Sequence, residues 1–460
     1  MTRCGQQELV RGRAGGGPPA PGPIPGAAGA RRPRRAGLSN GLFLGFAIAW
    51  AAAAARADLD AYLKRPEPQG RWEKAAETNL KDVRFTTLRL TSQVWRGIPW
   101  KHTVRVFRPQ TLLSPTLAVL SVTGGGGEDN EALANAARSC GVAVCILSDI
   151  PNQPLFGDKR EDNLIAYTFE QYVQTGEDDW PLLFPMTKAA VKAMDAIQEL
   201  SRKEWGAGIT QFVVTGASKR GWTSWLAAAA DPRVAGVIPM VYDNLNLAAQ
   251  MKNQLASWGA YSDRIADYTR RNLQALLETE RGRVLGGMVD PYAFRDRLAR
   301  IPKLIVNGTN DPYWPLDSLN LYWDGLEGQK DVLYVPNGTH GSGGDARVAD
   351  ARLAFVRRLA AGSSLPPLRW QHGGANGALT LRMTCAETPV EARLWVARAA
   401  TRDFRKAAWA STPAAKDGDG FTGKADPPAS GFLALFGEAV FKDGDRSFSL
   451  STAVRIVSAN

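Results

Sequence analysis

The chain has little histidine and little cysteine, with three and four residues respectively among 460. The cysteines are Cys4, Cys140, Cys145 and Cys385. The histidines are His102, His340 and His372. Neither set has the spacing of a disulfide framework or of a metal-ligand cluster. We therefore expect no metal and no cofactor, and a fold stabilised by its apolar core, for which this length is ample.

An excess of basic charge is missing from most of the chain, although the formal net charge is +11. Residues 1–57 contain eight arginines and one glutamate, which leaves 48 Lys and Arg against 44 Asp and Glu elsewhere. The basic balance thus belongs to the N-terminal segment. It does not predict binding to nucleic acid.

Beyond that segment the sequence also lacks an apolar run long enough to cross a bilayer. Residues 1–30 are rich in Gly, Pro and Ala and are expected to be disordered. Four arginines at 31–35 precede the apolar run 42–55, which ends in Ala55-Arg56-Ala57. This pattern predicts a secretory signal peptide cut before Asp58, and hence a periplasmic or secreted protein with no stable membrane span. An uncleaved N-terminal anchor is the alternative.

Apolar strands alternate with helical patterns over most of the remaining chain. The expected strands cover 84–91, 102–107, 117–122, 142–147, 212–215, 234–241, 304–306 and 332–335. The expected helices cover 128–139, 187–204, 218–230, 317–326 and 346–361. The order predicts an α/β domain over 58–364 with an eight-stranded, mostly parallel sheet. A long irregular stretch at 151–185 and a helix-rich, lid-like insert at about 243–300 are expected to wall a pocket.

A second domain is expected from residue 365. Pro366 and Pro367 predict a linker. Alternating polar and apolar residues then recur at 378–384, 391–397, 431–441 and 447–457. Clusters of Gly, Pro and Asp separate these segments, so 365–460 is predicted to form a small all-β, sandwich-like domain.

Ser218 stands at the most informative position in the chain. The apolar run before it and the alanine-rich helical segment after it are typical of a nucleophile elbow, the sharp turn that exposes a serine above a sheet. Its second glycine, Gly221, comes one residue later than in G-x-S-x-G, and Arg220 stands at the position that is usually small. Asp311 and His340 each follow a later apolar strand, in the chain order of the α/β-hydrolase triad.

Each triad residue has a simpler alternative. Ser218 could be a helix N-cap, Asp311 a turn residue and His340 a surface-loop histidine. Asp243, which follows the strand at 234–241, is a competing candidate for the acid. We prefer Asp311 because its Gly-Thr-Asn-Asp-Pro turn predicts a fixed loop geometry.

Further candidate residues are expected around the predicted nucleophile, Ser218. The backbone N–H of Lys219 and one from the glycine run at 124–127, at Gly125 or Gly126, are predicted to form the oxyanion hole. A flexible turn is the alternative for that run. Arg220 could bind a substrate carboxylate or form an ion pair that holds the neighbouring loop. Trp314, with Tyr313 and Trp180, is a candidate pocket wall.

Several dispersed segments resemble the PhoPQ-activated pathogenicity-related protein family. They are PNQPL (151–155), EDNLIAY (161–167), PMTKA (185–189), GASKRGWTSW (216–225), DPRV (231–234), SWGAY (257–261), NGTNDP (307–312) and RDFR (402–405). The resemblance extends roughly from residue 58 to the C-terminus. It implies an exported protein of α/β-hydrolase type that is linked to envelope stress and virulence, with no settled substrate.

Together these observations predict an exported serine hydrolase that cleaves an ester or amide. A small molecule, a peptide or an envelope-derived molecule is the expected substrate. The alternative is a binding or signalling protein that uses a hydrolase scaffold without catalysis.

Overall fold

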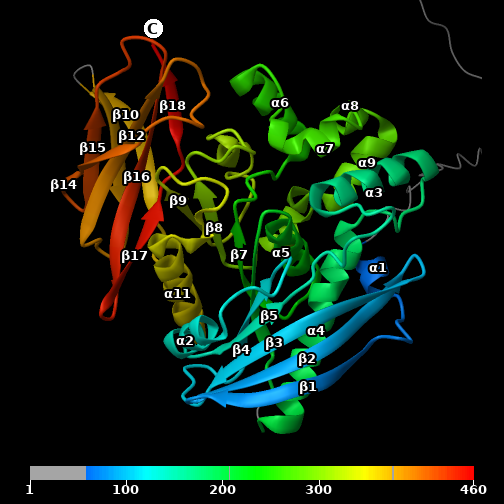
Figure 1. Ribbon diagram of the computed structural model, residues 1–460. Helices are drawn as coiled ribbons and strands as arrows, with labels where there is room; N and C mark the ends of the chain where they lie inside the picture. The colour runs from blue at the N-terminus through cyan, green and yellow to red at the C-terminus, as the bar shows by residue number, and fades with distance from the viewer. Residues whose placement is uncertain (1–58, 207, 376–377, 460) are drawn as a thin grey trace, which may run out of the picture. The chain divides into compact units, whose positions relative to one another are not determined.

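A large mixed β-sheet forms the framework of the computed structural model, which describes residues 59–206, 208–375 and 378–459 (Figure 1). The strands of its first part are Arg71–Leu80 (β1), Val83–Trp95 (β2), Ile98–Pro109 (β3), Leu117–Val122 (β4), Ala143–Leu147 (β5), Gln211–Ala217 (β6), Val234–Met240 (β7), Lys303–Gly308 (β8) and Lys330–Val335 (β9). They lie in the order β1-β2-β3-β5-β4-β6-β7-β8-β9. The predicted signal peptide lies outside the described residues.

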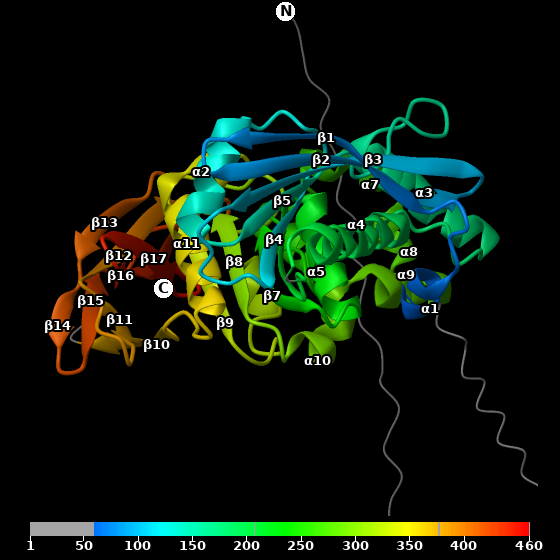
Figure 2. The same ribbon diagram turned by 90° about the horizontal axis from the view of Figure 1, so that it is seen from below.

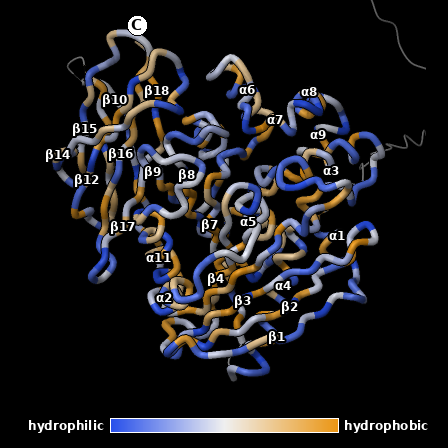
Figure 3. The backbone as a smooth tube through the Cα atoms, viewed as in Figure 1, coloured by the Kyte–Doolittle hydropathy of each residue, from blue (hydrophilic) through white to orange (hydrophobic). Residues whose placement is uncertain are grey.

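The sheet is antiparallel from β1 to β5 and parallel from β5 through β4 and β6 to β9. All eight predicted strands are present, and β1 is a ninth that the sequence analysis missed. Its sequence, RWEKAAETNL, is exposed along most of its length because the strand lies at the sheet edge, and its polar colour contrasts with the inner strands (Figure 3). An edge strand without a buried face lacks the apolar alternation that reveals a strand.

Helices cover both faces of the sheet. They are Asn130–Cys140 (α2), Leu183–Glu204 (α4), Lys219–Ala230 (α5) and Ala346–Ala360 (α11). Leu59–Lys64 (α1) packs on α4, and Glu161–Thr175 (α3) packs against the helical insert. Along β4, Ala118 and Leu120 pack in one core with α4 and α5, whereas Leu117 and Val119 pack in a second core with α2 and α11. Successive side chains of a strand point to opposite faces, so one apolar run supplies both cores. Figure 2 shows α2 and α11 on one side of β4 and β5, and α4 and α5 on the other.

The predicted helical insert is present between β7 and β8. Its α-helices are Leu247–Trp258 (α6), Ala266–Thr269 (α7), Leu273–Leu276 (α8), Glu280–Val289 (α9) and Arg295–Leu298 (α10). Figure 1 shows α6 to α9 gathered with α3 above α5. Two expectations were wrong at this edge. Residues 151–185 contain α3, and 317–326 forms only the 3₁₀ turn Ser318–Leu321.

Different contacts accompany the two differences. The side chain of Gln153, eight residues earlier, accepts a hydrogen bond from the backbone N–H of Glu161, the first residue of α3, at 2.8 Å. Asn320 of the 3₁₀ turn instead donates to the carbonyl of Val454, 134 residues later, at 2.9 Å. At 317–326 a partner so distant in sequence overrides the local helical preference.

The C-terminal region contains two facing sheets. Its strands are Arg369–Ala375 (β10), Ala378–Thr384 (β11), Glu391–Ala399 (β12), Ala410–Pro413 (β13), Ala415–Asp417 (β14), Gly420–Ala425 (β15), Phe432–Asp443 (β16), Arg446–Ser451 (β17) and Arg455–Ser458 (β18). Strands β10, β11, β15 and β14 form a separate sheet, and β12, β13, β16, β17 and β18 extend the main one. A Cβ at Gly437 would lie 2.3 Å from the Met383 sulfur across the interface, so the two sheets pack closely.

This sandwich-like region is joined to the preceding part through the sheet itself. Ser451 of β17 pairs with Val332 of β9. Contacts place it in one compact unit with the rest of the described chain. The boundary at residue 365 therefore stays a prediction about sequence organisation.

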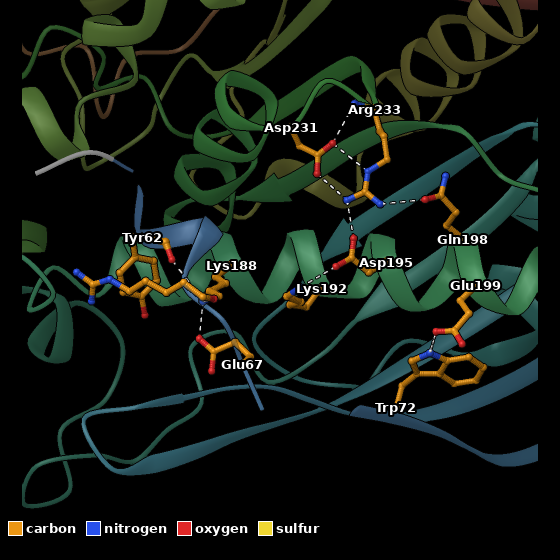
Figure 4. A network of polar contacts seen from close by, with 11 residues as sticks. Tyr62, Glu67, Trp72, Lys188, Lys192, Asp195, Gln198, Glu199, Asp231 and Arg233 are labelled. Atoms are coloured by element: carbon orange, nitrogen blue, oxygen red, sulfur yellow. Dashed lines mark hydrogen bonds and ion pairs between the residues drawn. The ribbon is translucent and has the colours of Figure 1, made fainter. Parts of the chain in front are cut away.

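Polar contacts hold α4 against its neighbours (Figure 4). The buried ammonium of Lys188 donates to the carbonyls of Tyr62 at 3.3 Å and Arg65 at 2.8 Å, and it pairs with Glu67. Further along the helix, Asp195 pairs with Arg233, at the start of β7, at 2.9 Å. Since α4 packs in the same core as α5, these contacts also support the helix that follows Ser218.

Candidate active site

Ser218 occupies a strained turn between β6 and α5. Its φ of 56° and ψ of −127° lie in a region that L-residues rarely adopt. Two backbone hydrogen bonds hold it there, from Ser218 N to the Met240 carbonyl at 2.8 Å and from Trp222 N to the Ser218 carbonyl at 3.0 Å. Within the described structure the Ser218 side chain makes no capping hydrogen bond to α5. The geometry is that of a nucleophile elbow, with the hydroxyl left free.

The late glycine of the motif has a steric reason. A Cβ at Gly221 would lie 3.0 Å from the Gly216 carbonyl oxygen and 3.1 Å from that of Met240. These are tighter contacts than the backbone accepts without shifting. The close approach of α5 to β6 and β7 therefore occurs at the third residue after Ser218, and position 220 is free to carry a long side chain.

Asp311 and His340 meet at the ends of β8 and β9. His340 Nδ1 lies 2.8 Å from Asp311 Oδ2, and Asp311 Oδ1 accepts the backbone N–H of Tyr313 at 2.8 Å. The Tyr313 ring stacks on the imidazole with centroids 4.0 Å apart. His340 Nε2 is buried and has no hydrogen-bond partner among the described residues. The imidazole is thus oriented through one nitrogen while the other is free to accept a proton.

The competing acid, Asp243, has a different partner. Its Oδ1 accepts the Tyr322 hydroxyl at 2.6 Å. Burial raises the pKa of Asp243 to about 7, despite the opposing hydrogen bond from Tyr322. Of the two carboxylates, Asp311 is the one that contacts His340.

Two basic residues after Ser218 form ion pairs with two acidic residues at the start of α3. Both Nη atoms of Arg220 lie 2.7 Å from the Glu161 carboxylate, and Arg220 Nε donates to the Ile150 carbonyl at 2.6 Å. Lys219 Nζ lies 2.9 Å from Glu161 and 3.1 Å from Asp162. Arg220 therefore adopts the loop-holding ion pair that the sequence left open. A substrate carboxylate would have to displace Glu161 to bind it.

The electrostatic balance favours the ionised glutamate. Partial burial by itself would raise the pKa of Glu161, but the hydrogen bond and charge of Arg220, together with Lys219, lower it to about 2. Neither Glu161 nor Asp162 was predicted to belong to the site. The sequence does contain an acidic pair at 161–162 and a basic pair at 219–220, but only the tertiary structure shows that the two pairs form ion pairs with each other.

The glycine run packs on the same arginine. A Cβ at Gly124 would lie only 2.1 Å from Arg220 Nη2, so the guanidinium fits there because the side chain is absent. Thr123 Oγ1 donates to the Gly125 carbonyl at 2.6 Å, and Gly125 and Gly126 are exposed. The run thus lies beside the elbow. The role of Gly125 or Gly126 as an oxyanion donor remains a prediction, as does that of the Lys219 N–H.

A pocket with about 800 Å³ of empty space, its mouth included, opens beside Ser218. Its lining is Asp162, Phe169, Ser218, Lys219, Trp222, Tyr242, Asn244, Leu247, Met251, Ile265, Tyr268, Leu273, Gln274, Leu277, Leu285, Gly286, Val289, Tyr313 and Trp314. Trp314 and Tyr313 are among these lining residues, and a role of Trp314 in substrate binding stays a prediction. Trp180 lies elsewhere, in an aromatic cluster with Trp95 and Phe156.

In the described ranges no group of three or more His, Cys, Asp or Glu residues is arranged to hold a metal ion. Across the same ranges, no helix combines the length and the apolar character that crossing a bilayer requires.

A sequence profile described as "PhoPQ-activated pathogenicity-related protein" matches residues 59–405. The chain belongs to this family. The match starts where the resemblance was expected to start but ends at residue 405, before β13 to β18, and not at the C-terminus. "Autocrine proliferation repressor protein A" of Dictyostelium discoideum is 31% identical over 377 residues, which cover 75% of this chain and 76% of that protein.

Solved structures similar to this chain include two esterases. Acetyl xylan esterase 1 from Thermoanaerobacterium sp. JW/SL YS485 has a TM-score of 0.47 and 17% identity, over 66% of this chain and 93% of its own. The glucuronoyl esterase from Solibacter usitatus has a TM-score of 0.40 and 11% identity, over 64% of this chain and 86% of its own. The predicted fold of α/β-hydrolase type is present in the chain's own topology: β2 to β9 form the predicted sheet, a helical insert follows β7, and a C-terminal β region extends the sheet.

Proposed function

We propose that this protein is a serine hydrolase that cleaves an ester or amide through Ser218, Asp311 and His340. One observation carries the proposal. His340 is bound to Asp311 through Nδ1, and its buried Nε2 has no partner among the described residues. A general base needs an imidazole that a carboxylate orients through one nitrogen and whose other nitrogen is not engaged by the protein, and His340 has this arrangement.

The proposed reaction follows from the roles of these groups. Ser218 Oγ attacks the carbonyl carbon while His340 Nε2 takes the hydroxyl proton, and Asp311 holds the imidazole and stabilises its charged form. The oxyanion receives the Lys219 N–H at the N-terminus of α5 and an N–H of Gly125 or Gly126. His340 then protonates the leaving group. Water, activated by His340 in turn, hydrolyses the acyl-serine and regenerates the enzyme.

The location of the enzyme is part of the proposal. Residues 1–57 have the pattern of a secretory signal, and we infer an exported protein that works in the periplasm or outside the cell. The family name, which includes the words "pathogenicity-related", supports a role in virulence. A mature N-terminus at Asp58 supports export with cleavage. An intact leader on the purified protein contradicts it.

Labelling with a fluorophosphonate and hydrolysis of a short acyl ester test the chemistry. Ser218→Ala and His340→Ala are expected to lose turnover by at least about 10³-fold, and Ser218→Ala to lose labelling altogether. Two matched controls lie away from the proposed chemistry. Ser224, on α5, donates to the Arg220 carbonyl at 2.8 Å, and His372 lies in the C-terminal region, so Ser224→Ala and His372→Ala should keep both activities.

The decisive contrary outcome is a folded wild type that neither labels nor turns over. That result would favour a non-catalytic binding protein on the same scaffold. Loss of labelling in Ser224→Ala as well would show that the assay reports folding and not the nucleophile.

A further inference from the structure

The pocket beside Ser218 is apolar on most of its surface. Helices α6 and α9 contribute residues such as Met251, Leu285 and Val289, and α3 contributes Phe169. Only a few polar side chains reach it. A site of this composition gains binding free energy from burying apolar surface and uses few polar contacts for orientation.

The charges in this pocket satisfy one another. Asp162 lies 3.1 Å from Lys219 Nζ, and it also accepts the Tyr268 hydroxyl at 3.1 Å. Arg220, which is close to the nucleophile, is already held by Glu161. A charged substrate group would have to break these pairs, whereas a hydrocarbon needs no polar partner.

A second cavity adjoins the first, between α6 and α8. It contains about 790 Å³ of empty space, its mouth included, and is lined by Ala248, Met251, Lys252, Leu255, Tyr261, Thr269, Asn272, Gln274, Ala275, Leu277 and Glu278. Three residues line both cavities, namely Met251, Gln274 and Leu277. A path from the Ser218 pocket into the second cavity would run past these three residues.

We propose that this path binds the linear acyl chain of the substrate, with the ester carbonyl at Ser218 and the end of the chain between α6 and α8. The inference rests on the proposed serine chemistry and adds a substrate class, namely esters of medium-chain to long-chain fatty acids. A compact acyl group such as acetyl would leave the second cavity empty. A linear chain fills both cavities in sequence.

A series of p-nitrophenyl esters from acetyl to dodecanoyl tests this on the full chain. We expect kcat/KM to rise with chain length by up to about fourfold per methylene, the factor that corresponds to about 0.8 kcal/mol of apolar burial. The rise should continue beyond the length that fills the first cavity alone. An N-acetyl-phenylalanine p-nitrophenyl ester serves as the comparison for a peptide-like, aromatic substrate.

Variants at the junction locate the chain. Leu277→Trp should lower the ratio of decanoyl to acetyl ester kcat/KM by tenfold or more, because the larger side chain narrows the passage. Leu276→Trp is the matched control, since the neighbouring leucine belongs to neither lining, and its ratio should equal that of the wild type. Met251→Trp on the opposite helix is the second test should Leu277→Trp fail to fold.

The outcomes distinguish a failure of the proposed acyl path from a failure of the proposed serine chemistry. A flat or falling chain-length profile, or preference for the phenylalanine ester over decanoyl, overturns the acyl path while Ser218-dependent turnover stands. An equal drop of the ratio in Leu276→Trp and Leu277→Trp also overturns it. Absence of Ser218-dependent labelling instead removes the proposed function itself.

Discussion

Arg220 and Glu161 form a bidentate ion pair with both N–O distances at 2.7 Å, and this pair joins the nucleophile turn to the first residue of α3. Arg220 stands two residues after Ser218, where the strict motif has a glycine. Glu161 has a φ of 51°, an unusual value for a residue without a glycine's freedom. The pair thus holds two strained segments against each other, which makes both residues positioning groups for the site.

Removal of either Arg220 or Glu161 should therefore disturb the turn that carries Ser218. We expect Arg220→Gln and Glu161→Gln each to lower kcat by roughly 10- to 100-fold through displacement of the turn, with the double variant no worse than either. Arg220→Lys should recover only part of the loss, since lysine lacks the two-pronged geometry.

A double-mutant cycle on stability provides the second readout for this pair. Its coupling free energy should be on the order of 1 kcal/mol, because the arginine is largely buried and the contact is bidentate. The exposed pair Arg382 and Asp417, at 2.7 Å, is the control and should give a coupling near zero. Additive losses of kcat in the double variant would show that the two residues act separately.

The same glutamate predicts a pH dependence of stability. Its pKa falls from 4.5 to about 2 on folding, so its stabilising contribution is complete above pH 4.5 and is lost as the pH falls toward 2. The difference in free energy of unfolding between the wild type and Glu161→Gln should shrink over that range in urea titrations.

Asp331 serves as an internal comparison, because its contribution to stability should change with pH in the opposite direction. Burial raises its pKa from 3.8 to about 7, so its contribution is lost as the pH rises through that range. Asp331→Asn should gain stability relative to the wild type from pH 4 to 7. If the free energies of unfolding of Glu161→Gln and Asp331→Asn, each relative to the wild type, changed with pH in the same direction, the two pKa shifts would be contradicted.

Replacement of Asp311 and of Asp243 by asparagine, one at a time, distinguishes the two candidates for the triad acid. Asp311→Asn should lower kcat/KM by roughly 10³- to 10⁴-fold, since an amide can no longer fix the imidazole in the required tautomer. Asp243→Asn should stay within a few-fold, because the amide oxygen can still accept the Tyr322 hydroxyl. Comparable losses in both variants would mean that Asp243 takes part in the chemistry.

Alanine substitutions in the glycine run test its contact with the arginine. Gly124→Ala would place a Cβ 2.1 Å from Arg220 Nη2 and should lower kcat as Arg220→Gln does. Gly127→Ala is the matched control, because in the described structure nothing lies within 4 Å of its added Cβ. Both variants keep their backbone N–H groups. Equal tolerance of the two substitutions in kinetic and thermal-unfolding measurements would argue against a tight contact.

Part of the fold was open to prediction from local pattern. The inner strands, such as Leu117–Val122, are buried on both faces and therefore read as continuous apolar runs. By contrast, β1 has no buried face, and α3 starts at a residue held by Gln153 and Arg220. An element that is stabilised mainly by contacts with residues elsewhere in the chain leaves no periodic signal in its own sequence.

The candidate site divides in the same way. The chain order of Ser218, Asp311 and His340, each after an apolar strand, determined the type of site to expect, because parallel strands bring their C-terminal ends to one edge. The tertiary structure decided which acid contacts His340, that Arg220 pairs with Glu161, and that apolar side chains from α6, α8 and α9 line the pocket. The first two depend on side chains 29 and 59 residues apart in the sequence, and no local pattern encodes how close such residues lie in space.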